Sequence, residues 1–173
     1  MVLPKNSVKI GDLARISFGQ TIACTPLQLL NATAIAINGG TKVTPKLVKE
    51  IYSPSGEVSI KVEGKSEENV ISKKTSSTIC SYLENVVSVG SGKQAYIEGY
   101  RVAGKTGTAQ KYENGIIAAG KYVSSFVGYF PANAPKYLAL VIIDEPVGQY
   151  YGSTVAAPYA KQVFEGIIDI KNL

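Results

Sequence analysis

The spacing of apolar residues along the chain predicts three long helices. Apolar side chains recur every three to four positions over residues 26–37, about 73–89 and about 157–170. Thr25 and Ser72 stand where N-caps belong, and Gln28, three residues after Thr25, completes a capping box. Because helix caps mark where helices begin, we expect the first two helices to start at residues 26 and 73.

Shorter apolar runs, bounded by turn residues, predict three strands in the second half of the chain. They cover residues 100–110, 122–130 and 137–144, with a tight link over 131–136. Residues 110–121 are expected to form a longer loop with Asn114-Gly115 at its tip. The predicted fold is α/β, of the α+β type, in which an antiparallel sheet is flanked by helices.

The segment between the first two predicted helices has a different pattern. Residues 44–62 are interpreted as two extended segments around the turn Ser53-Pro54-Ser55-Gly56. Residues 63–69 are charged and are expected to be mobile. No internal repeat and no second domain are indicated, so residues 1–173 are interpreted as one domain or part of one.

Composition narrows the functional classes. The chain has 173 residues, of which 45% are hydrophobic and 18% charged, and this balance fits a globular core. The net charge of +5 is interpreted as solvated lysine faces, with steering toward an anionic cell wall or membrane surface as the functional alternative. Nucleic-acid binding is not expected, because no basic helix with stacking aromatic residues is present. The absence of histidine excludes histidine-based triads.

The two cysteines carry no metal or disulfide signature. Two cysteines without histidine cannot build a zinc site, so no metal is expected. Cys24 precedes one predicted helix and Cys80 lies within another, so both are expected to be buried free thiols.

The run Lys105-Thr106-Gly107-Thr108 is the strongest candidate for chemistry. On an edge strand, alternation sends Lys105 and Gly107 to one side and Thr106 and Thr108 to the other. Gly107 leaves the backbone open to an approaching ligand. An ammonium group, two hydroxyls and an open backbone suit a carboxylate-bearing peptide that lies along the strand.

A nucleotide site is the competing interpretation. Residues 99–106 fit the phosphate-loop pattern G-x-x-x-x-G-K-[ST], and residues 138–145 form an apolar run that ends in Asp144-Glu145. A phosphate loop must open a helix, however, and Gly107, Thr108 and the Asn114-Gly115 turn disfavour one after Thr106. This alternative requires a helix directly after Thr106.

The order of several motifs resembles the C-terminal half of penicillin-binding protein transpeptidase domains of the class B, monofunctional kind. The matching blocks are Ser17-Phe18-Gly19-Gln20 with Thr25-Pro26-Leu27-Gln28-Leu29 and Asn38-Gly39-Gly40, residues 104–110, residues 125–131, Asp144-Glu145-Pro146 and residues 151–158. The family also uses a Ser-x-x-Lys and a Ser-x-Asn motif, both upstream of its Lys-Thr-Gly strand. No serine of this chain has lysine at the third or asparagine at the second following position. The chain is therefore expected to be a C-terminal portion of the domain that is inactive by itself.

The resemblance implies a function and roles for named residues. It implies a serine D,D-transpeptidase of cell division or sporulation that cross-links peptidoglycan stem peptides ending in D-Ala-D-Ala, binds β-lactams and needs no cofactor. Lys105, Thr106 and Thr108 would hold the substrate carboxylate, the Thr108 N–H would form half of the oxyanion hole, and Gly107 would leave room for the acyl group. Gln110 and Tyr112 would line the acceptor side.

The resemblance also implies a location and leaves an alternative open. The whole protein would be membrane-anchored, with this domain on the extracytoplasmic face. The exposed edge of an incomplete sheet would permit dimerisation or strand swapping. The remaining alternative is a non-catalytic module of the same fold that senses a β-lactam or docks a partner.

Overall fold

The centre of the molecule is a three-stranded antiparallel sheet. The computed structural model describes residues 4–20 and 22–173, and its main strands are β5 (Ala103–Glu113), β6 (Ile116–Phe130) and β7 (Tyr137–Asp144). The strand order is β5-β6-β7, so β5 is an edge strand. In its register Lys105 lies opposite Val127 and Gly107 opposite Ser125. The predicted α+β class and the edge position of the Lys105 strand are confirmed.

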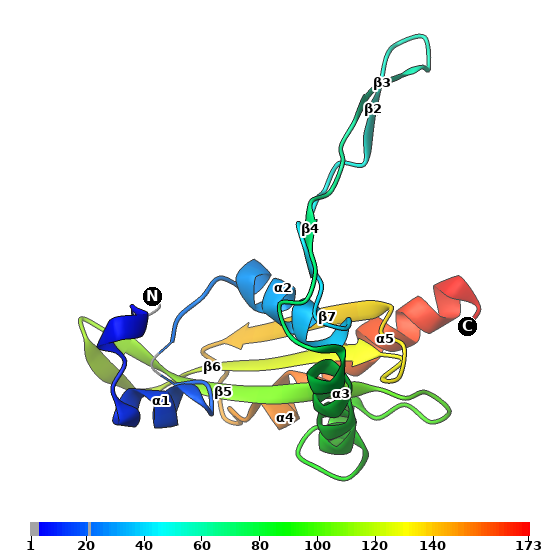
Figure 1. The fold of residues 1–173 in the computed structure, drawn as a ribbon. Coiled ribbons are helices and arrows are strands. Elements are labelled where there is room, and N and C mark those ends of the chain that lie inside the picture. Colours follow the sequence, from blue (N-terminus) through cyan, green and yellow to red (C-terminus); the bar gives the residue numbers. More distant parts are fainter. Residues whose placement is uncertain (1–3, 21) are drawn as a thin grey trace.

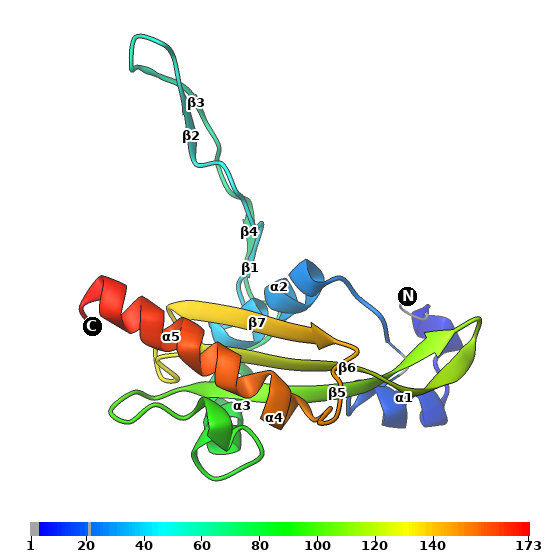
Figure 2. The ribbon, with the colours of Figure 1, turned by 180° about the vertical axis from the view of Figure 1, so that it is seen from behind.

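Helices cover both faces of this sheet. Helix α5 (Ala157–Lys171), preceded by the short α4 (Gly152–Val155), packs on the face seen in Figure 2. Helix α2 (Pro26–Ile37) lies over β7 on the opposite face, and α3 (Lys73–Ser88) packs beside it against β5 (Figure 1). The three long helices begin and end within one residue of the predicted positions.

Alternation along β6 divides the core into two clusters. Phe126 and Phe130 point toward α5, where they pack with Phe164. Tyr129 points the other way and packs with Ile37 of α2. Each face of the sheet is thus sealed by its own helix layer, which is the pattern of an α+β domain.

The predicted helix caps are present. The Thr25 hydroxyl accepts a hydrogen bond from the Gln28 N–H at 3.2 Å, and the Gln28 side chain accepts one from the Thr25 N–H at 2.9 Å. The Ser72 hydroxyl accepts from the Thr75 N–H at 3.0 Å. These bonds satisfy amide groups that the first turn of a helix leaves unpaired.

The prediction of a long loop over residues 110–121 is wrong. β5 and β6 continue as a hairpin almost to its tip, and only Asn114 and Gly115, with φ of 52° and 80°, form the turn. A two-residue turn with positive φ at both positions matches the twist of paired strands, so it allows the ladder to continue to the end. The Asn114-Gly115 tip itself was predicted correctly.

A long two-stranded arm projects from the body of the molecule (Figure 1). At its base β1 (Lys42–Val43) pairs with β4 (Ser66–Glu67), and farther out β2 (Glu50–Tyr52) pairs with β3 (Val58–Lys61). The two extended segments around the turn over residues 53–56 are confirmed. Within residues 63–69, β4 completes the base of the arm, and the expected mobility of this segment stays a prediction.

The N-terminal part contains two short helices that the sequence pattern did not predict. They are η1 (Lys5–Ser7) and α1 (Ile10–Ile16). Another short helix, η2 (Lys93–Ala95), lies in the loop between α3 and β5. No helix within residues 4–20 and 22–173 is long and apolar enough to cross a bilayer.

Candidate functional site

The candidate motif lies on the open edge of the sheet. Residues Lys105, Thr106, Gly107 and Thr108 are consecutive in β5, and only β6 pairs with this strand. The chain after Thr106 is a strand rather than a helix, so no helix N-terminus is available for a phosphate group. The nucleotide alternative is therefore overturned.

The two threonines of the motif face the side of the sheet that carries α4. The Gly152 N–H donates a hydrogen bond to Thr108 Oγ1 at 3.1 Å. Thr106 Oγ1 lies 3.3 Å from Ser91 Oγ, and either hydroxyl can donate. Because Thr108 Oγ1 accepts from Gly152, its own proton is free for another acceptor. The sequence analysis missed both partners, since Ser91 and Gly152 are distant from the motif along the chain.

Lys105 lies on the outer rim of the strand. Its side chain is exposed, and Nζ donates to the Thr106 carbonyl oxygen at 2.8 Å. An exposed ammonium held close to its own strand remains available to an anion that approaches the edge.

Two glycines permit close packing at the motif strand, Gly152 of α4 against the strand backbone and Gly107 against Ser125 of β6. A Cβ on Gly152 would collide with the carbonyl oxygens of Gly107 and Ser125, which are backbone atoms that cannot turn aside. A Cβ on Gly107 would lie 2.5 Å from the Ser125 hydroxyl. Gly152 thus permits the close approach through which its N–H reaches Thr108.

Three tyrosines gather next to this contact. The rings of Tyr122 and Tyr150 stack with centroids 4.1 Å apart, and the Tyr150 and Tyr151 centroids are 4.6 Å apart. The Ser124 hydroxyl donates to the Tyr150 carbonyl oxygen, which fixes the segment that leads into α4. The hydrogen bond to Tyr151, with the charges of Tyr151 and Tyr122, raises the pKa of Tyr150 to about 12. The Tyr150 phenol is therefore neutral at neutral pH.

Gln110 and Tyr112 lie farther along the same strand. Gln110 is opposite Tyr122, and Tyr112 is opposite Ile117 in the protruding half of the hairpin. Both side chains are exposed. The structure brings Gln110 next to the tyrosine cluster and places Tyr112 beyond it.

Ion pairs connect the part of β5 beyond the motif to the end of β7. Lys111 Nζ lies 3.0 Å from an Asp144 oxygen and 2.7 Å from a Glu145 oxygen. These hydrogen bonds raise the pKa of Lys111, and the bond to Glu145 contributes most. Asp144 and Glu145, the acids that the nucleotide alternative needed for magnesium, are thus paired with a lysine.

The described residues contain no group of three histidine, cysteine or acidic side chains that could hold a metal ion. Cys24 and Cys80 are free thiols, as expected. Their predicted burial is wrong for Cys24, which is exposed, and holds in part for Cys80, which is half-buried. Cys24 lies in the connection before α2, where no helix covers it.

Comparisons with known proteins give a consistent result. Residues 3–165 match the family model of the penicillin binding protein transpeptidase domain. Stage V sporulation protein D of Bacillus subtilis is 40% identical over 160 residues, which are 91% of this chain and 25% of that protein. Peptidoglycan D,D-transpeptidase FtsI of Buchnera aphidicola is 36% identical over 177 residues, 99% of this chain and 30% of that protein. The chain spans about a quarter to a third of the length of these relatives.

Solved structures agree with the sequence matches. Penicillin binding protein 3 of Mycobacterium tuberculosis superposes with a TM-score of 0.88 at 26% identity, over 99% of this chain and 41% of that one. The same protein has been solved in complex with aztreonam and with ampicillin. The transpeptidase domain of Burkholderia pseudomallei penicillin-binding protein 3 matches all of this chain and 50% of that chain, with a TM-score of 0.83.

Proposed function

The chain belongs to the penicillin-binding protein transpeptidase family, and from this premise we propose that it supplies the carboxylate-binding strand of a peptidoglycan D,D-transpeptidase. The observation that carries the proposal is the position of Lys105-Thr106-Gly107-Thr108 on the one open edge of β5. A peptide can lie against such an edge and present its carboxylate to the side chains of the strand.

Each residue of the motif has a role in this proposal. The Lys105 ammonium attracts the terminal carboxylate of a D-Ala-D-Ala stem peptide, and the Thr106 and Thr108 hydroxyls donate hydrogen bonds to it. The hydrogen bond from Gly152 fixes the Thr108 hydroxyl in an orientation that leaves its proton available. Gly107 leaves room for the acyl group, and Gln110 and Tyr112 line the acceptor side.

The chemistry itself is acyl transfer through a serine ester. A serine hydroxyl attacks the penultimate D-Ala carbonyl, the terminal D-Ala leaves as a protonated amine, and an acceptor amine then displaces the serine. The Thr108 N–H stabilises the oxyanion in both steps, and the loss of one such donor typically costs about 2.7–4 kcal/mol of transition-state stabilisation. The sequence has no Ser-x-x-Lys motif, so the isolated chain is inactive in this proposal.

The same strand would bind β-lactams, and the substrates proposed here also imply where in the cell the domain acts. A β-lactam carries a carboxylate beside its reactive amide, so it meets the same side chains as the stem peptide does. Complexes of the M. tuberculosis relative with aztreonam and ampicillin support this part. In this proposal the domain acts on the extracytoplasmic face of a bacterial membrane, in division or in sporulation.

The acylation rate tests the role of Lys105. The chain is joined to an upstream half that carries the two serine motifs, and its reaction with benzylpenicillin is followed by intact mass. We expect Lys105→Ala to slow acylation by at least about a hundredfold, the size of an oxyanion-hole or charged-contact loss. Lys121→Ala, on β6 in the hairpin, is the matched control and keeps the wild-type rate. Equal rates for both variants would remove Lys105 from the site.

A further inference from the structure

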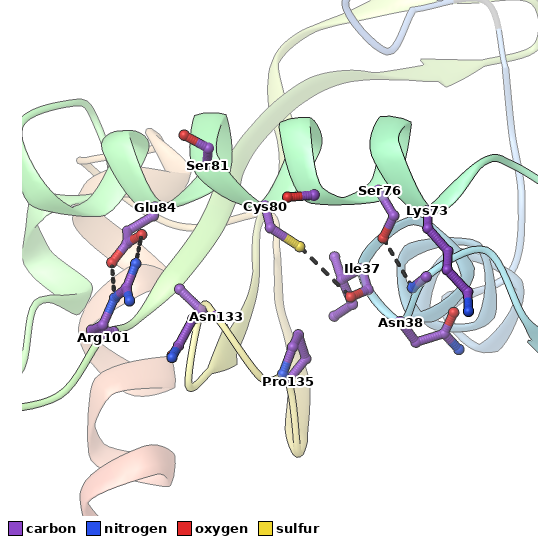
Figure 3. Close-up of a pocket in the computed structure, with 13 residues that line it drawn as sticks. Ile37, Asn38, Lys73, Ser76, Cys80, Ser81, Glu84, Arg101, Asn133 and Pro135 are labelled. Atoms are coloured by element: carbon purple, nitrogen blue, oxygen red, sulfur yellow. Dashed lines mark hydrogen bonds and ion pairs between the residues drawn. The ribbon is translucent and has the colours of Figure 1, made fainter.

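A separate cavity of about 510 Å³ lies between the end of α2, the length of α3 and the turn between β6 and β7 (Figure 3). Ile37, Cys80 and Ala132 contribute to its walls. Its volume falls in the range of small-molecule sites. Arg101, at one end of the cavity, precedes Thr108 by seven residues, about 20 Å of extended chain, so the cavity is distinct from the motif site.

The charges around this cavity leave one cation unpaired. At one end Arg101 binds Glu84 through two hydrogen bonds, of 2.6 and 2.7 Å. The charges of these two side chains cancel. At the other end Lys73 reaches from α3 toward Asn38 (Figure 3). Its side chain has no hydrogen bond or ion pair to any residue within 4–20 and 22–173. The cavity thus presents a single positive charge at one end.

The middle of the cavity has a mixed wall, in which Ser76, Ser77 and Ser81 of α3 lie beside Cys80. Its apolar surface comes from Pro135 and the half-buried Cys80, because Ile37 and Ala132 are buried in the core. The Cys80 thiol donates to the Ile37 carbonyl oxygen at 3.6 Å. The amide of Asn133 makes no side-chain hydrogen bond to the part of the chain that the structure describes. Lys73 and Cys80 are seven helical residues apart, or about 10 Å.

We propose that this cavity is a second binding site, for a small monoanion of dipeptide size. The carboxylate binds Lys73, a short body lies against Cys80 and Pro135, and an amide of the ligand hydrogen-bonds Asn133. A carboxylate is favoured over a phosphate group, because only one unpaired cation faces the cavity and phosphate carries nearly two charges at neutral pH. The proposal does not depend on the transpeptidase chemistry.

The Cys80 thiol in the cavity wall reports occupancy directly. The full chain is alkylated with iodoacetamide in the presence of N-acetyl-L-alanyl-L-alanine or of its neutral C-terminal amide. The rates at Cys80 and at the exposed Cys24 are read by peptide mass spectrometry. We expect the carboxylate peptide to protect Cys80 but not Cys24, and to do so at about tenfold lower concentration than the amide, the size of one charged hydrogen bond.

Two lysine variants assign the effect to the cavity. Lys73→Gln removes the preference for the carboxylate peptide, whereas Lys74→Gln, on the same helix turn but outside the cavity, preserves it. Equal or absent protection by the two peptides, or an unchanged preference in Lys73→Gln, would overturn the proposal. Protection by inorganic phosphate as strong as that by the peptide would overturn the carboxylate assignment.

Discussion

At the scale of single residues, two residues outside the motif, Gly152 and Ser91, set the geometry of its hydroxyls. Gly152 has no side chain, so α4 can approach the backbone of β5 and β6 and direct its N–H at Thr108. Ser91 reaches Thr106 from the loop after α3. The motif hydroxyls are therefore oriented by residues outside the motif.

This close approach makes Gly152 sensitive to the smallest substitution. We expect Gly152→Ala to reduce the free energy of unfolding by about 1–3 kcal/mol, because the added Cβ meets backbone oxygens that cannot move independently. Urea unfolding measures the effect. Gly166→Ala, in the interior of α5 where an added Cβ meets nothing within 4 Å, is the control and should stabilise the chain by up to about 1 kcal/mol. Equal stability of Gly152→Ala and the wild type would contradict the close packing of α4.

At the scale of elements, local signals predicted some boundaries well and others poorly. Helix α2 begins where Thr25 and Gln28 form their capping box, since these signals lie within four residues of one another. The base of the arm could not be predicted in this way. Val43 pairs with Ser66, 23 positions later in the chain, and no local motif in either strand indicates its pairing partner. The hairpin ladder beyond Gln110 was also missed, because charged and small residues there conceal the strand pattern.

The link between α3 and the start of β5 has a pH dependence. The hydrogen bonds from Arg101 are the main cause that lowers the pKa of Glu84. A carboxyl group whose pKa is lower in the folded state contributes stability above its unfolded pKa and loses it as the pH falls through the folded pKa. Because Arg101 is more than half exposed, screening limits this contribution to about 1 kcal/mol or less.

Urea unfolding from pH 7 to pH 3 measures this contribution. We expect Glu84→Gln to be less stable than the wild type at pH 7, and the difference to shrink as the pH falls through the lowered folded-state pKa of Glu84. Glu98→Gln, at an exposed position without an ion pair in the described structure, serves as the control and shows no such convergence. A constant difference between Glu84→Gln and the wild type across this range would assign the effect to packing rather than charge.

At the scale of the whole molecule, the sequence predicted the fold class and the edge strand, while the contacts that complete the site came from the fold. The order of the three long helices and the three main strands is visible in local patterns, and the motif is contiguous. The partners of Thr106 and Thr108 are 15 and 44 residues away, so no local pattern connects them. The cavity along α3 has the same origin, because α2, α3 and the turn after β6 come together only in the folded chain.

The central claim is that this chain supplies half of an acyl-transfer site. Intact mass after exposure to benzylpenicillin tests it most directly, for the chain alone and for the chain joined to an upstream half with both serine motifs. We predict one penicilloyl adduct on the joined protein and none on the chain alone. The absence of an adduct on a folded joined protein, or an adduct on the chain alone, would contradict the claim.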